Sequence, residues 1–314
     1  MSQRYLTTVE QIEALKQLNT IEFYARQIVE GFLTGIHRSP YHGFSVEFAE
    51  HRTYNPGEST RFIDWKLYGR TDKLYVKKFE AETNLRCQLL LDTSSSMLYP
   101  VGQRVNKLGF SALCAAAMAH LLSKQRDSVG ITTFTQAIDT HLPSRLSAAH
   151  QKTIFGKLNE LLLRTFDTSQ TSTGERTSLA PVLHQVAEML PKRSLVVLFS
   201  DIFSDEPSDE IFNGFEYLRY NHHEVIVFQV THNRTEKNFE LENRPYKIID
   251  METGEVLKLS PTEIRSYFQR LAAEHQEQLK RRFLQYKIDY IEADIERPFD
   301  QVLSPWLMKR SRMY

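Results

Sequence analysis

The stretch that decides the fold is Gln88-Leu89-Leu90-Leu91-Asp92-Thr93-Ser94-Ser95-Ser96-Met97. Its short apolar run, closed by polar residues, is typical of a strand that is buried on both faces. Such strands form mostly parallel sheets covered by helices, and the ligands of these sheets bind at the carboxyl ends of the strands. We therefore expect Asp92, Ser94 and Ser96 to lie at a binding edge. The alternative is that they only cap the next helix.

Two later segments favour a binding site over a helix cap. The segment from Ser194 to Asp201 is a second apolar strand that ends in an Asp, and Thr177 lies in a turn that opens an apolar helix. The ordered pattern of Asp92-x-Ser94-x-Ser96, Thr177 and Asp201 resembles the metal-ion-dependent adhesion site (MIDAS) of the von Willebrand factor A fold.

The resemblance implies a role for each of these five residues. Ser94, Ser96 and Thr177 would contact the ion, and Asp92 and Asp201 would complete its shell directly or through water. An acidic residue of a protein partner would fill the open coordination position. Hydroxyl and carboxylate oxygens suit a hard cation, so we expect magnesium, Mg²⁺, or alternatively Mn²⁺.

The segment from Gly43 to Met97 resembles the signature of the bacterial domain-of-unknown-function-58 (DUF58) family. The matching motifs are Glu47-Phe48, Pro56-Gly57-Glu58, Ile63-Asp64-Trp65 and Leu74-Tyr75-Val76-Lys77, followed by the Asp92 segment. The chain departs from the family pattern at Glu58, where Asp is more usual, and at Gly174-Glu175-Arg176, which replaces a tighter turn before Thr177. The resemblance implies a von Willebrand factor A-like core and a MoxR-type AAA+ ATPase as partner.

Strand and helix patterns alternate from Cys87 onward, which predicts an α/β fold with a doubly wound, mostly parallel sheet flanked by helices. We expect residues 85–314 to form this von Willebrand factor A-like domain. Residues 1–84 are expected to supply an N-terminal helix and an extended, turn-rich segment packed on the core. Within the domain, we expect Pro143 to end a pair of strands, and His222 and His223 to be surface or rim residues.

Composition excludes several classes of partner and compartment. The 314 residues carry a formal net charge of zero, so nothing draws the chain as a whole to nucleic acid or to an anionic membrane. Cys87 and Cys114 form no CxxC pair, which favours a reducing compartment. No apolar run reaches the ~20 residues of a membrane span, and no signal-peptide pattern follows Met1. We expect a cytoplasmic protein.

Motifs for catalysis are missing from the sequence. There is no P-loop, no GxGxxG and no GxSxG nucleophile elbow. A metal-dependent phosphatase or hydrolase that uses Asp92 as nucleophile is the alternative, but Ser94 stands where such an enzyme would need an acid/base Asp. We therefore predict no enzyme, no catalytic residue and no organic cofactor. The expected function is a metal-ion-dependent protein-binding adaptor that works with a MoxR-type AAA+ ATPase, or its client, in the assembly or maturation of other proteins.

Overall fold

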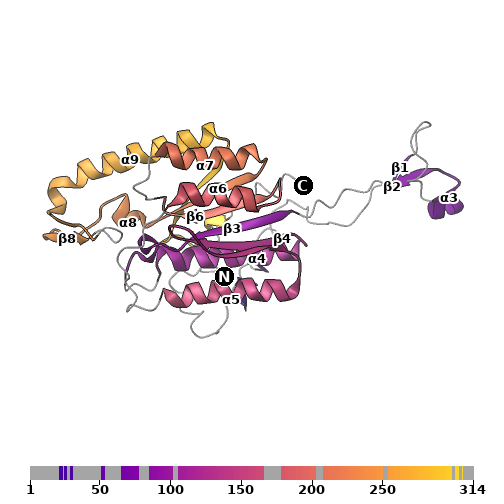
Figure 1. Cartoon of the computed structure of the whole chain (residues 1–314), viewed down its shortest axis with the longest axis horizontal. Coiled ribbons are helices and arrows are strands. Elements are labelled where there is room, and N and C mark those ends of the chain that lie inside the picture. The colour runs from indigo at the N-terminus through magenta and orange to yellow at the C-terminus, as the bar shows by residue number, and fades with distance from the viewer. Residues whose placement is uncertain are drawn as a thin grey trace, which may run out of the picture.

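Figure 1 shows a computed structural model of the chain. It describes residues 21–23, 25–26, 29–30, 51–53, 65–77, 85–101, 105–165, 178–202, 208–249, 254–298, 301–303 and 306.

A six-stranded sheet forms the centre of the molecule. Its strands are, in spatial order, β10 (Asp289–Asp294), β7 (Glu224–Thr231), β6 (Leu195–Ser200), β3 (Arg86–Asp92), β4 (Ser128–Phe134) and β5 (Ile138–Arg145). Every neighbouring pair is parallel except β4 and β5. The chain builds one half of the sheet outward from β3 and the other half outward from β6, so the strand order reverses between them. This topology confirms the doubly wound, mostly parallel α/β fold expected of a von Willebrand factor A-like domain.

Helices cover both faces of the sheet (Figure 1). One face packs against α4 (Lys107–Lys124) and α5 (Ala148–Arg164). The other packs against α6 (Leu179–Met189), α7 (Ser208–Tyr220) and α9 (Pro261–Gln285). Successive side chains of a strand point to opposite faces, so Leu89 and Leu91 belong to the first core and Leu90 to the second. The uninterrupted apolar run of β3 is therefore explained by burial on both sides.

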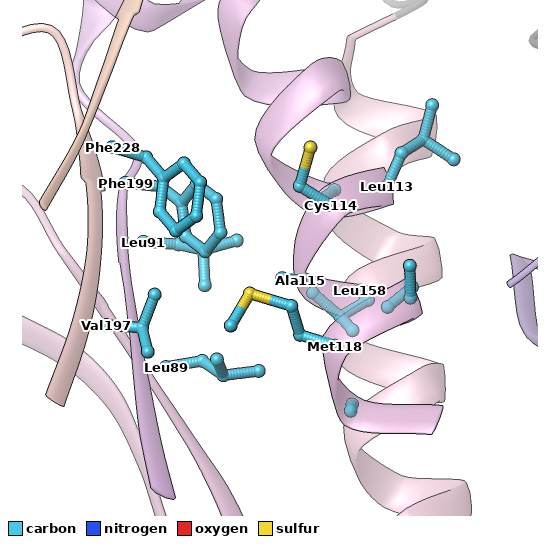
Figure 2. Packing of buried hydrophobic residues seen from close by; sticks show 14 of the residues in the cluster. Leu89, Leu91, Leu113, Cys114, Ala115, Met118, Leu158, Val197, Phe199 and Phe228 are labelled. Atoms are coloured by element: carbon cyan, nitrogen blue, oxygen red, sulfur yellow. The ribbon is translucent and has the colours of Figure 1, made fainter. Parts of the chain in front are cut away.

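The core against α4 is close-packed because that helix is rich in alanine. Figure 2 shows sheet residues facing Ala115 and Met118 of α4; they are Leu89, Leu91, Val197, Phe199 and Phe228. Asn106 caps the helix, since its side chain accepts a hydrogen bond of 2.8 Å from the backbone N–H of Gly109. The cap fixes the start of α4 at Lys107, and this places a lysine in the first turn of a buried helix.

Two elements differ from the sequence-based expectation. Pro143 does not end a strand, because β5 continues to Arg145. β5 is an edge strand with a neighbour on one side only. Proline has no backbone N–H to donate, and edge strands tolerate this loss. The short helix α8 (Asn233–Glu236) was not predicted, because four residues are too few to show a helical period. β8 (Tyr246–Ile249) and β9 (Val256–Leu259) form an antiparallel pair between α8 and α9 in sequence.

The N-terminal region is described in part. Ile21, Ala25 and Val29 are buried and belong to the same core cluster as α4. Further along, β1 (His51–Thr53) pairs antiparallel with β2 (Tyr75–Lys77), and α3 (Trp65–Thr71) lies between them in sequence. Other parts of residues 1–84 lie outside the described residues, so the domain boundary after residue 84 stays a prediction. No helix in the described part of the chain combines the length and apolar character that a membrane crossing requires.

The expectation for His223 was wrong. His222 adopts a positive φ of 63°, and the turned backbone directs the next side chain inward at the start of β7. The His223 side chain is fully buried, and its Nδ1 accepts a hydrogen bond of 3.2 Å from the backbone N–H of Ser194. Burial disfavours the charged imidazolium and lowers the pKa of His223 below its usual value.

Acid should therefore destabilise the protein through His223. Below about pH 6.5, the usual histidine pKa, the unfolded chain takes up a proton that folded His223 resists, so stability falls with pH until the lowered pKa is passed. His223→Asn keeps an acceptor for Ser194 but does not titrate. Thermal unfolding at pH 7.5 and pH 5.5 should show a larger loss in the wild type than in His223→Asn. His120 and His141, whose pKa values burial also lowers, are present in both proteins. Equal losses would contradict this assignment.

Candidate metal centre

The two predicted aspartates meet at the point where the strand order reverses. Asp92 is the last residue of β3, and Asp201 follows directly after β6, the neighbouring parallel strand. Asp92 is fully buried and Asp201 is 1% exposed. The carboxyl ends of strands at such a reversal form the crevice in which α/β sheets bind ligands. The structure thus places both carboxylates at the expected edge.

Hydrogen bonds fix both oxygens of the Asp92 carboxylate. Oδ1 accepts from the backbone N–H of Ser94 at 3.0 Å, and Oδ2 accepts from the Ser200 hydroxyl at 2.7 Å. Ser200 was missed by the sequence analysis, because its position before Asp201 reads as the end of an ordinary buried strand. The arrangement does not support simple capping by Ser94, whose side chain makes no capping hydrogen bond to the following 3-10 helix η2 (Ser95–Leu98).

The two predicted serines lie side by side. The Oγ atoms of Ser94 and Ser96 are 3.0 Å apart. Adjacent ligands of an octahedral Mg²⁺ at about 2.1 Å lie about 3.0 Å from each other, so the two hydroxyls fit neighbouring coordination positions. In the ranges that the structure describes, no group of three or more His, Cys, Asp or Glu is arranged to hold a metal. A metal centre at this edge would therefore depend on the serine hydroxyls.

Electrostatics at this edge also suit a cation. Burial, and then the negative charge of Asp201, raise the pKa of Asp92 to about 7. Both causes disfavour the ionised carboxylate. A divalent ion beside Asp92 would outweigh them and favour the ionised form. The residues present thus fit a Mg²⁺ or Mn²⁺ ion in both geometry and charge. Thr177 lies outside the described residues, and its part in the centre stays a prediction.

A lysine that was not predicted stands beside Asp201. The Nζ atom of Lys107 donates to Asp201 Oδ2 at 2.7 Å and to Glu236 Oε1 at 2.7 Å. Lys107 is 1% exposed. Burial by itself would lower the pKa of Lys107, but the charges of Asp201 and Glu236 outweigh it and raise that pKa above its usual value. The one signal in the sequence was a charged residue directly before the apolar run of α4.

The same network fastens α8 to the rim of the centre. Glu236 Oε2 accepts from the backbone N–H of His232 at 2.7 Å. The Tyr99 hydroxyl donates to Thr235 Oγ1 at 2.8 Å, and the Tyr99 ring packs edge-on against the His232 ring. α8 is therefore linked to Tyr99, the residue that follows η2, and through Lys107 to Asp201.

A family model, several sequence relatives and several solved structures match this chain. The family model described as "Protein of unknown function DUF58" matches residues 50–278. Uncharacterized proteins of Mycobacterium tuberculosis and Mycobacterium bovis are 28% identical over 269 residues, covering 84% of this chain and 79% of theirs. Among solved structures, the conserved hypothetical protein BatB from Bacteroides thetaiotaomicron matches with a TM-score of 0.41 and 13% identity, over 73% of this chain and 99% of that one. Proximal thread matrix protein 1 from the mussel byssus matches with a TM-score of 0.32 and 14% identity, over 60% of this chain and 47% of that one.

Proposed function

This chain belongs to the DUF58 family, and we propose that it is a metal-ion-dependent protein-binding module. The observation that carries the proposal is the pair of serine hydroxyls 3.0 Å apart, beside the buried carboxylates of Asp92 and Asp201, at the reversal of strand order. Mg²⁺ or Mn²⁺ would be held by Ser94, Ser96 and Thr177, with Asp92 and Asp201 in support.

The ligand chemistry favours binding a protein over catalysis. Hydroxyl ligands are neutral, so an ion held by them keeps much of its charge and gains from a further carboxylate brought by a partner. Asp92 is fully buried and both of its oxygens accept hydrogen bonds, which makes it a poor nucleophile. Ser94 lies where an acid/base Asp would be needed. We therefore propose a non-enzymatic role.

The proposed partner is a MoxR-type AAA+ ATPase, or a client protein of that ATPase, carrying an exposed Asp or Glu. The family signature in the sequence, and not the geometry of the metal centre, points to this partner. The adaptor would act in the assembly or maturation of other proteins.

Metal titration tests the proposal. Ser96→Ala removes one hydroxyl ligand, and even the loss of a residue that only orients a ligand weakens metal binding by ~10–100-fold. Calorimetry with Mg²⁺ and Mn²⁺ should show binding by the wild type and a loss of at least this size in Ser96→Ala and in Thr177→Ala. Lys192→Ala is the matched control, because Lys192 is exposed and precedes the amino end of β6, at the opposite edge of the sheet.

A binding assay with a purified MoxR-type ATPase extends the test to the partner. Wild type and Lys192→Ala should bind it in Mg²⁺ and lose it in EDTA, whereas Ser96→Ala should bind weakly in both. If calorimetry shows no heat of binding at millimolar Mg²⁺ or Mn²⁺, the protein does not bind these ions and the proposed metal dependence is wrong. ATPase binding that is unaffected by EDTA and by Ser96→Ala would place the interface elsewhere.

A further inference from the structure

Lys107 stands where a lysine is costly. The residue is 1% exposed, and it lies in the first turn of α4, where the helix dipole already disfavours a positive charge. Ion pairs this deeply buried can often be replaced by apolar residues without loss of stability, so folding alone gives a weak reason for the lysine. The short contacts from Nζ to Asp201 and Glu236 give a different reason, which lies in the charge of the centre.

The charges at the centre can be counted from the described residues. Asp92, Asp201 and Glu236 supply three carboxylates, and Lys107 supplies one ammonium. Two negative charges are left when all four are ionised, and one divalent ion neutralises them. Without Lys107 the same ion would leave a negative excess, which would repel an incoming carboxylate.

We infer that Lys107 is a tethered cation of the centre: its ammonium weakens the hold of the protein on the divalent ion and keeps the occupied site neutral, so that it accepts an acidic group of a partner. The inference rests on the proposed metal-dependent function. Lys107 would be a positioning residue, which acts through the carboxylates and does not itself contact the acidic group of the partner. The same ammonium holds Glu236, and through the contact of Glu236 with the His232 backbone it holds α8 beside the site.

Two variants should shift metal affinity in opposite directions. Lys107→Met removes the ammonium with little change of shape, and Glu236→Gln removes one carboxylate and keeps the length of the side chain. Calorimetric titration with Mn²⁺ should show binding about tenfold or more tighter in Lys107→Met, and several-fold weaker in Glu236→Gln, because unit charges this close interact by more than about 1 kcal/mol in a partly buried site. Lys192→Met, which alters a lysine at the opposite edge of the sheet, should match the wild type. A lysine that only supports the fold would give weaker or unchanged binding in both variants.

Thermal unfolding gives a second measurement. Mn²⁺ at a fixed concentration should raise the melting temperature of Lys107→Met by more than that of the wild type. In the variant, the ion offsets the negative charge of the carboxylates that have lost their ion pair with Lys107. If Lys107→Met does not fold, Lys107→Gln, which also lacks the charge but keeps a polar end, replaces it: tighter Mn²⁺ binding than in the wild type supports the inference, and equal or weaker binding overturns it.

The outcomes separate this inference from the proposed function. Equal Mn²⁺ binding by wild type, Lys107→Met and Glu236→Gln would overturn the role of Lys107 and leave the metal centre standing. Binding by Lys107→Met but not by the wild type would support Lys107 as the cation of the site and overturn metal dependence in the natural protein. No binding by any of the proteins would overturn both.

Discussion

Lys107→Met, studied in the absence of divalent ions, is expected to lower the free energy of unfolding by about 3–5 kcal/mol. The substitution removes the shared partner of two carboxylates, one of them 1% exposed and the other with a side chain that is 20% exposed. Uncompensated charge in a buried site costs more than the pair contributed, because each carboxylate has already lost its water. Urea denaturation of wild type and variant in EDTA measures the difference.

A second variant shows whether charge is the cause. Adding Asp201→Asn to Lys107→Met removes the more deeply buried of the two uncompensated carboxylates, so the double variant should be more stable than Lys107→Met alone. The coupling between the two positions should be about 1 kcal/mol or more, because residues in direct contact are not additive. Additive losses would mean that Lys107 contributes through its aliphatic stem and not through its charge.

Gly130→Ala is expected to cost about 3 kcal/mol of stability, at the upper end of what overpacking a core does. Gly130 lies in β4, where a Cβ atom would meet the carbonyl oxygen of Leu142 at 2.5 Å and the backbone nitrogen of Ser144 at 2.6 Å. It would also meet the side-chain oxygen of Gln88. The backbone atoms belong to β5, whose register against β4 shifts at this point, and they cannot move without breaking the strand pair.

Gly156→Ala is the matched control for this prediction. Gly156 lies in the interior of α5, and nothing is within 4 Å of a Cβ built there. Alanine is favoured over glycine in a helix by roughly 0.5–1 kcal/mol, so this variant should be slightly more stable than the wild type. Chemical denaturation of the three proteins gives the comparison. A Gly130→Ala variant as stable as the wild type would mean that β5 can move away from β4.

The part of the centre carried by β3 was predictable because it is local. Its three residues, Asp92, Ser94 and Ser96, lie within five positions of each other. The apolar run before them indicates a buried strand that ends at Asp92. Asp201 ends a second run of the same kind. Strands of this type join parallel sheets, and the carboxyl ends of parallel strands lie at one edge, so the meeting of Asp92 and Asp201 followed from pattern alone.

The sequence by itself determined the α/β class, the family and four of the residues that meet at the sheet edge, because each of these follows from short-range periodicity or a local motif. Only the tertiary structure decided what surrounds them. The ion pair of Lys107 with Glu236 joins residues 129 positions apart, and the hydrogen bond from Ser200 to Asp92 spans 108. Contacts between residues so far apart in sequence depend on the order of the strands in the sheet and on the position of α8 beside the metal centre. Neither leaves a periodic trace, and so a lysine that reads as the start of an apolar helix proves to be the buried cation beside Asp201.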